Sequence, residues 1–119
     1  MDEATTKIFI SVKNSIVGIE DDTSFDSSIL AAINTSLSIL EDNGVGSKDF
    51  YIKDSNDIST WIDFIGNSDE KHVLSMIIFY VENKARSIFD PPTNSILLTA
   101  LNNQLDEMLY RIKSRIEDD

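Results

Sequence analysis

The chain has no cysteine among its 119 residues. This excludes disulfide bonds, thiol catalysis and cysteine-based zinc sites. Histidine occurs once, at His72. Its place at the acidic start of a helical pattern favours an exposed position over a catalytic one. GxSxG, HExxH and P-loop patterns are also missing. The pair Gly44 and Gly46 lacks the third glycine of a nucleotide-binding loop, and a helix stop explains it.

Basic residues are scarce. The chain has 10 Lys and Arg against 21 Asp and Glu, which gives a net charge of −11. A surface this acidic opposes binding to nucleic-acid phosphates and to anionic membranes. The acidity is concentrated in residues 1–63, where twelve acidic and four basic residues give −8. We therefore expect any DNA that approaches the protein to be held at a distance.

Long apolar runs are absent as well. The longest, from Val73 to Val81, contains Ser75 and is too short to cross a bilayer. The acidic start Met1–Glu3 differs from the basic start of a secretory signal. The length fits one domain over residues 1–119 with a modest core. We expect a soluble cytosolic protein.

Apolar residues recur at helical spacing, which predicts an all-α fold: a small bundle of four to five helices. In the first helical pattern Ile8, Val12, Ile16 and Ile19 repeat every three or four residues, and Gly18 supplies a left-handed stop. The second is expected to begin at Ser24, a common N-cap residue type, with Asp26 in its first turn. Asn43–Gly44 ends it.

Residues 45–56 are the least helical part of the chain. Val45 is expected to pack back on Leu40 behind the glycine stop. A short β-type run follows, made of Phe50, Tyr51 and Ile52. A single strand is not stable alone, so this run is expected to pair with another segment or with another subunit.

Two further helices are expected before residue 90. Asp57 can cap a short helix that holds Trp61 and ends at Gly66. Trp61 fits a core anchor, and the alternative is an interface hot spot. Ser68 can cap a long helix that ends near Phe89. Its middle is apolar almost all round, which predicts that it is the central helix.

The only two prolines are adjacent, in Phe89-Asp90-Pro91-Pro92. Proline fixes φ, lacks an N–H and pushes the preceding residue out of the α region. This segment therefore predicts a rigid elbow before a last helix over about 94–117. An apolar seam on that helix suits packing against its neighbour. Phe89 fits either the core beneath the elbow or a pocket in a neighbouring subunit.

No motif predicts catalysis, a cofactor or a metal. Asp54 to Asp57 resembles the start of a calcium loop, but Ser59 and Ile65 stand where glycine and a bidentate glutamate are needed. Paired carboxylates need burial in one pocket to split their pKa values, and the sequence places no such pair. We expect a non-enzymatic protein.

Several features follow one another in an order that resembles a known family. They are Gly18-Ile19, then Asp26 with Ile29, Ile33, Asn34 and Leu40, then Gly44-Val45-Gly46, Phe50, Trp61, the elbow and the ending Tyr110-Arg111-Ile112. This order resembles the head–tail connector proteins of long-tailed phages, also described as head-completion, adaptor or DNA-packaging proteins. The resemblance covers nearly the whole chain, and the Phe-Asp-Pro-Pro elbow is its sharpest part.

The resemblance implies a structural virion protein at the head–tail junction, assembled in the host cytoplasm. It implies a dodecameric ring of copies beneath the portal protein after genome packaging. The ring would extend the DNA channel, pass DNA without sequence-specific binding and offer a docking surface to the next connector or tail-completion protein. No membrane partner is implied. The interface or structural candidates are Phe50, Tyr51, Ile52, Trp61, Phe89, Asp90, Pro91 and Pro92.

Three other interpretations remain. A small helical regulator would need a basic recognition helix, for which Lys84-Ala85-Arg86 is the best and a sparse candidate. A metal-dependent hydrolase would have to use the acidic loops. A generic acidic protein–protein adaptor of phage or bacterial origin needs no special residues.

Overall fold

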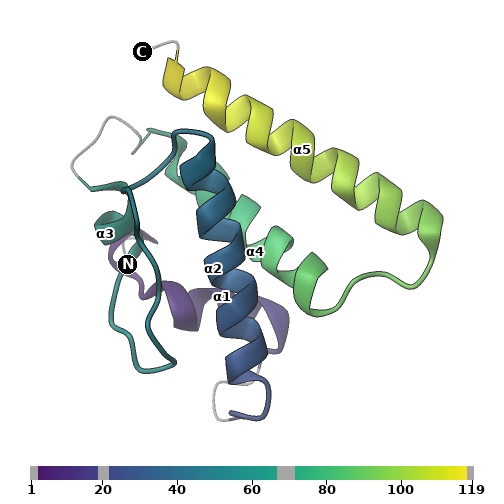
Figure 1. The fold of residues 1–119 in the computed structure, drawn as a ribbon, viewed down its shortest axis with the longest axis horizontal. Coiled ribbons are helices and arrows are strands. Elements are labelled where there is room, and N and C mark those ends of the chain that lie inside the picture. Colours follow the sequence, from purple (N-terminus) through teal and green to yellow (C-terminus); the bar gives the residue numbers. More distant parts are fainter. Residues whose placement is uncertain (1–2, 19–21, 67–71, 118–119) are drawn as a thin grey trace.

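The structure is a computed structural model that describes residues 3–18, 22–66 and 72–117. These residues form five α-helices and one short 3₁₀ helix, with no β-strand among them, so the predicted all-α fold is confirmed (Figure 1). The elements are η1 (Glu3–Thr5), α1 (Ile8–Ile16), α2 (Asp26–Asp42), α3 (Trp61–Ile65), α4 (Leu74–Phe89) and α5 (Ser95–Glu117).

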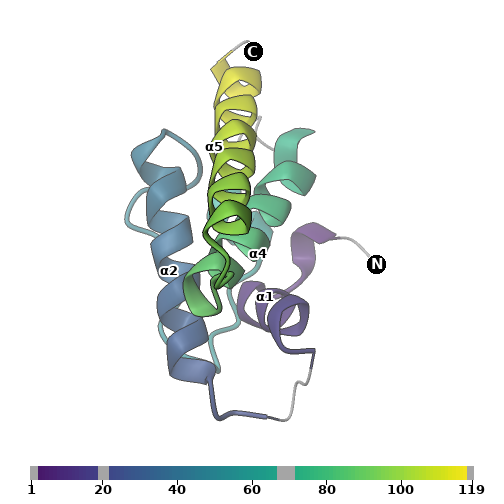
Figure 2. The same ribbon diagram turned by 90° about the vertical axis from the view of Figure 1, so that its right-hand side faces the viewer.

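Helix α4 is the centre of the arrangement, as its apolar middle predicts. It packs against α1, α2 and α5, and Ile77, Tyr80, Val81 and Ala85 are its buried residues. Helix α5 runs along one outer edge of the molecule, and the view from the side shows it in front of α4 (Figures 1 and 2). The predicted cap of α4, Ser68, lies outside the described residues. Helix α4 therefore holds the other long helices together.

The start of α2 differs from the prediction that Ser24 caps it. The helix begins at Asp26, and its N-cap, Phe25, offers no side-chain cap. The Asp22 carboxylate instead accepts a hydrogen bond from the backbone N–H of Ser24 at 2.9 Å. This is a local turn that aspartate forms with the residue two positions on. The turn engages Ser24 before the helix begins.

A buried ion pair joins α1 to α2. Lys13 Nζ lies 2.9 Å from Asp26 Oδ1, and the two side chains are 3% and 15% exposed. Asp26 does lie in the first turn of α2, as predicted, where the helix dipole favours a carboxylate. A charge buried in this way is costly unless its partner stays in place. The pair therefore fixes the first helix against the second.

Two glycines follow α2 for different reasons. Gly44 has φ +80° and ends the helix: its N–H donates to the Glu41 carbonyl, and the Val45 N–H donates to the Leu40 carbonyl. Val45 and Leu40 are both buried, so the predicted packing behind the stop is confirmed. Gly46 is not part of the helix stop. A Cβ there would lie 2.2 Å from the Phe64 ring.

The run of Phe50, Tyr51 and Ile52 forms no strand in the described part of the chain. Of the two expected partners, another segment and another subunit, a segment of the same chain pairs with it. The partner is a side chain of α2. Asn34 Nδ2 donates to the Ile52 carbonyl at 2.9 Å, and the Ile52 N–H donates to Asn34 Oδ1 at 2.7 Å. An amide has both a donor and an acceptor, so one asparagine replaces the neighbouring strand.

Helix α3 is capped by Thr60, which corrects the expectation that Asp57 caps it. Thr60 and Asp63 form a capping box, in which the Thr60 N–H donates to Asp63 Oδ2 at 2.8 Å. Asp57 closes the preceding turn and accepts from the N–H groups of Lys53 and Ser59. Burial raises the pKa of the Asp57 carboxyl, but these hydrogen bonds outweigh it and leave the pKa below its usual range.

Breaking the buried ion pair should cost far more stability than breaking an exposed one. In Lys13→Met the Asp26 carboxylate keeps its burial and loses its cation, so the free energy of unfolding should fall by about 3–5 kcal/mol. Arg111→Met is the matched control, because it breaks the exposed pair with Glu107 and should cost only about 0–1 kcal/mol. Urea denaturation measures both. Equal losses would show that the buried pair has no special role.

Removing the Asn34 amide should loosen the loop that carries Ile52. In Asn34→Ala both backbone groups of Ile52 lose their partner, which should cost about 1–3 kcal/mol. The Ile52 amide should then exchange its hydrogen faster than the amides of α2. Asn102→Ala, on the exposed side of α5, is the control. Unchanged protection of Ile52 in Asn34→Ala would contradict the role given to this amide.

Candidate interaction surfaces

The elbow between α4 and α5 has the form expected from its prolines. Helix α4 ends at Phe89, and the Asp90 N–H donates to the Arg86 carbonyl at 2.8 Å. Asp90 and Pro91 are exposed, while Pro92 is partly buried. The next helix starts under a new cap, because Asn94 Oδ1 accepts from the N–H of Ile96 at 2.8 Å. The elbow thus separates two independently terminated helices.

Phe89 packs within its own chain. Its ring meets the Phe25 ring edge-on, with the centroids 5.5 Å apart and the planes at 77°. Phe89 is only partly buried, and Phe25 is 48% exposed. Within the single chain Phe89 packs against the core beneath the elbow, and the aromatic pair still reaches the surface. Insertion of Phe89 into a neighbouring subunit stays a prediction. The pair connects the start of α2 to the end of α4.

A groove lies beside this aromatic pair, between α2 and the end of α4. We call it the α2–elbow groove. It has a volume of about 330 Å³ and is lined by Ser28, Ala31, Ala32, Thr35, Ile88 and Phe89. Ile88 is 41% exposed. The groove therefore offers apolar surface without a charged group in its lining.

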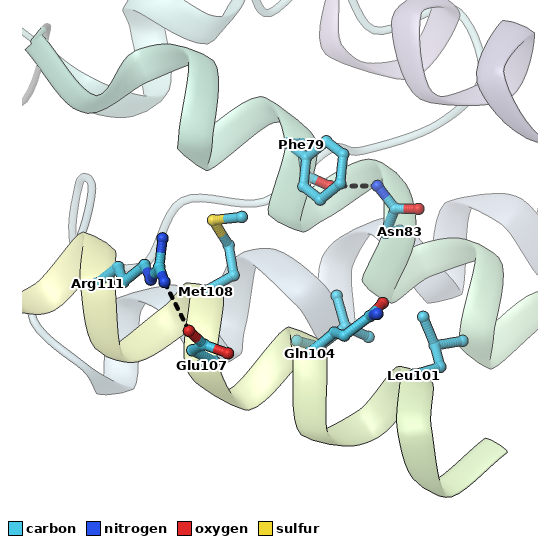
Figure 3. A pocket seen from close by; sticks show the side chains of 8 residues that line it. Phe79, Asn83, Leu101, Gln104, Glu107, Met108 and Arg111 are labelled. Atoms are coloured by element: carbon cyan, nitrogen blue, oxygen red, sulfur yellow. Dashed lines mark hydrogen bonds and ion pairs between the residues drawn. The ribbon is translucent and has the colours of Figure 1, made fainter. Parts of the chain in front are cut away.

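A second groove lies between α4 and α5 (Figure 3). Its volume is about 370 Å³, and its lining is Phe79, Asn83, Leu101, Gln104, Leu105, Glu107, Met108 and Arg111. Phe79 is 51% exposed. The Asn83 amide donates to the Phe79 carbonyl, and Arg111 pairs with Glu107 at 2.7 Å. The charged groups of this groove therefore already neutralise each other.

Most of the other predicted interface residues are turned inward. Trp61 is fully buried, as its interpretation as a core anchor requires. Ile52 is buried beside Asn34, and Phe50 packs edge-on against Phe64 with the centroids 5.3 Å apart. Tyr51 alone of the β-type run stays exposed, at 60%. Within the single chain Tyr51 is therefore the one exposed side chain of the run, Phe50 is partly buried and Ile52 is buried.

Sequence reasoning missed the exposed apolar side chains of α5. Ile96 is 77% exposed, Leu97 61% and Tyr110 70%. The predicted seam faces α4 through Leu105 and Ile112, which are buried, and these three residues lie outside it. For Ile96 and Leu97 the absence of charge from residue 91 to residue 105 was the available signal. It distinguishes this stretch from an ordinary solvated helix face.

The described residues offer no arrangement suited to metal chemistry. Among them, no group of three or more histidine, aspartate and glutamate side chains could hold a metal ion. Asp54 accepts from the Asn56 N–H at 2.9 Å, so the segment that resembles a calcium loop is used as a turn. His72 is exposed. None of the described helices is long and apolar enough to cross a membrane.

Comparison with known proteins gives one match. A family model described as phage connector protein matches residues 8–119, from the first residue of α1 through the last helix. The chain belongs to the phage connector protein family. No curated protein and no solved structure matches it.

Family membership gives this connector a structural role in a phage. It makes the protein a component of the virion that interacts with other head and tail proteins. The resemblance found from the order of sequence features is thereby confirmed. The part played by the elbow and by the other candidate residues stays a prediction.

A tyrosine of α4 is buried in the connector near a carboxylate of α5. Burial raises the pKa of Tyr80 to about 12, and the nearby Asp106 carboxylate adds to the effect. The neutral phenol is thus favoured in the folded protein. The raised pKa of Tyr80 contributes stability that is fully present below about pH 10, the ordinary pKa of a tyrosine in the unfolded chain. This stability is lost as the pH rises from about 10 through about 12.

Tyr80→Phe should therefore remove part of the alkaline loss of stability. Phenylalanine keeps the ring and has no proton to lose. Between pH 9 and pH 11.5 the free energy of unfolding of the variant should therefore decrease less than that of the wild type. Urea denaturation across this range measures the slope. Tyr51→Phe removes an exposed tyrosine and should keep the wild-type slope. A wild-type slope in Tyr80→Phe would show that Tyr80 is not the group responsible.

Proposed function

We propose that this connector joins the portal to the tail interface and extends the DNA channel after genome packaging. The observation that carries the proposal is the extent of the family match, which covers all five α-helices and the elbow. The proposed assembly is a dodecameric ring at the virion head–tail junction, built in the host cytoplasm. Each copy would act as one domain over residues 1–119, without catalysis.

The charge distribution supports a passage for DNA. Residues 1–63 carry a net −8, and exposed carboxylates include those of Asp42, Asp49, Asp54 and Asp63. Phosphates are held by lysine and arginine, and a negative wall repels them. A channel lined in this way would let DNA pass without sequence-specific binding. The same deficit of basic residues disfavours the alternative of a DNA-binding regulator.

The exposed apolar surfaces support several protein partners. The two grooves and the exposed side chains Ile96, Leu97 and Tyr110 of α5 involve different residues. Separate surfaces would let the protein contact neighbouring copies, the portal and the next connector or tail-completion protein at once. The elbow would set the angle at which α5 is presented, because prolines limit the backbone there. Geometry, and not reactive chemistry, is what this chain supplies.

Electron microscopy of the full-length chain mixed with portal rings of the same phage tests the proposal. We expect an additional ring of density on the tail side of the portal, coaxial with its channel. A gel shift at moderate salt should show no retention of duplex DNA by the connector alone. A portal that stays bare would contradict the proposed function, and sequence-dependent retention of DNA would favour a regulator.

The double variant Pro91→Ala with Pro92→Ala should assemble poorly while it stays folded. Without the prolines the elbow gains conformations, and α5 no longer has a fixed direction. Circular dichroism should show helix content close to that of wild type, while ring density on the portal is lost. Lys113→Ala, at an exposed position in the second half of α5, should assemble normally. Equal loss of folding and assembly would contradict this role of the elbow.

A further inference from the structure

Charge is missing from two stretches of this strongly acidic chain. Of all residues, 26% are charged, yet none is charged from Ser27 to Leu40 or from Pro91 to Leu105. These are the two longest uncharged stretches of the sequence. The first forms most of α2, and the second forms the elbow and the first half of α5. Both stretches reach the surface.

The exposed part of the first stretch borders the α2–elbow groove. Ser28, Ala31 and Thr35 contribute to the groove from α2, and Phe89 and Ile88 contribute from α4. The aromatic contact between Phe89 and Phe25 holds this end of α4 against the start of α2. The groove is thus formed by two helices in fixed contact, and its lining is uncharged.

The exposed part of the second stretch protrudes. Ile96 and Leu97 are 77% and 61% exposed, on the first turns of α5. Figure 1 shows these turns at the right-hand edge of the molecule, where the elbow has carried the chain away from α2. Large aliphatic side chains therefore project on one part of the surface, and an apolar groove opens on another.

The net charge limits which surfaces two copies of the chain can bring into contact. Two copies carry −11 each, so most pairs of surfaces would bring carboxylates together and repel. The core of a protein interface is depleted in charged residues. We propose that the first half of α5 in one copy lies in the α2–elbow groove of the next copy.

Such a contact joins two different surfaces of one chain. A head-to-tail contact of this kind repeats from copy to copy and closes into a ring when the rotation permits. The inference deepens the proposed function, on which it rests, because it assigns residues to the contact between neighbours in the ring. The stretch Ser95–Leu105 spans only about 16 Å of helix. One such contact is small beside a standard interface of about 800 Å² per partner, so free copies should associate weakly.

Cysteine cross-linking can capture a weak contact, and the natural chain has no cysteine to interfere. The double variant Ala31→Cys with Ile96→Cys places one thiol in the groove and one on the protruding turn. Oxidation at high protein concentration should give a ladder of dimers, trimers and longer species on a non-reducing gel. The control pair, Ala31→Cys with Tyr110→Cys, keeps its second thiol exposed on α5 but far along the helix. It should give at least about tenfold less product, which corresponds to about 1.4 kcal/mol.

The single variants Ala31→Cys and Ile96→Cys complete this test. Neither can extend beyond a disulfide-linked dimer, and neither should form dimers as readily as the double variant. Absence of a ladder, or equal ladders from the test pair and the control pair, would overturn the inference. Efficient dimers from one single variant would also overturn it, because they indicate a symmetric contact.

The portal assay then separates this inference from the proposed function. Ile96→Glu places a carboxylate inside the proposed contact and should lower the yield of portal-bound rings at least about tenfold. Lys113→Glu makes a larger change in charge at an exposed position of α5 and should assemble better than Ile96→Glu. Thermal unfolding should confirm that both variants stay folded.

The possible results are distinct. Wild-type rings with intact Ile96→Glu rings would overturn the inference and leave the proposed function standing. No wild-type ring would contradict the proposed function, while the ladder of the free chain would still report on the contact. A cross-link from Ile96→Cys to the portal, in place of a ladder, would show that the portal occupies α5.

Discussion

The fold depends on one helix being buried from several sides. Helix α4 contacts α1 and α2, and α5 packs on it from outside. Its residues Ile77, Tyr80 and Val81 are buried together because each neighbour covers a different part of its surface. A helix that is apolar on most sides has no stable position in water, so α4 determines where the other helices can lie. The ion pair of Lys13 and Asp26 then fixes α1 against α2.

Much of this arrangement could be predicted from apolar spacing and glycine positions. The helices, the stop at Gly44 and the central place of α4 follow local rules that neighbours in sequence satisfy. So does the stop at Gly18, which follows the C-cap of α1 with φ +69°. The predicted cap at Ser24 was wrong because a local turn with Asp22 engages Ser24 before the helix begins. The predicted cap at Asp57 was wrong because Asp57 closes the preceding turn and Thr60 caps the helix. The partner of Ile52 is Asn34, eighteen residues earlier on a helix. No periodicity connects those two positions.

On the candidate surfaces, too, features set by the local sequence could be predicted and features set by tertiary contacts could not. The elbow was predictable because proline acts on its own backbone and on the residue before it. The inward position of Phe50 was not, since it depends on the Phe64 ring, which also requires a glycine at Gly46. The exposure of Ile96 and Leu97 needed the structure, because only packing shows which side of α5 faces α4. The sequence explains why this exposure matters, because Ile96 and Leu97 lie in a stretch without charged residues.

The position of Trp61 makes it a useful fluorescent probe. It is the only tryptophan, and it is buried where α3 packs on η1, with its backbone N–H donated to the Thr6 carbonyl. Intrinsic fluorescence therefore reports on the body of the molecule at the end opposite the elbow. Movement of α5 away from α4 would leave that signal largely unchanged. The chain thus contains a natural optical probe that separates unfolding of the core from rearrangement of its last helix.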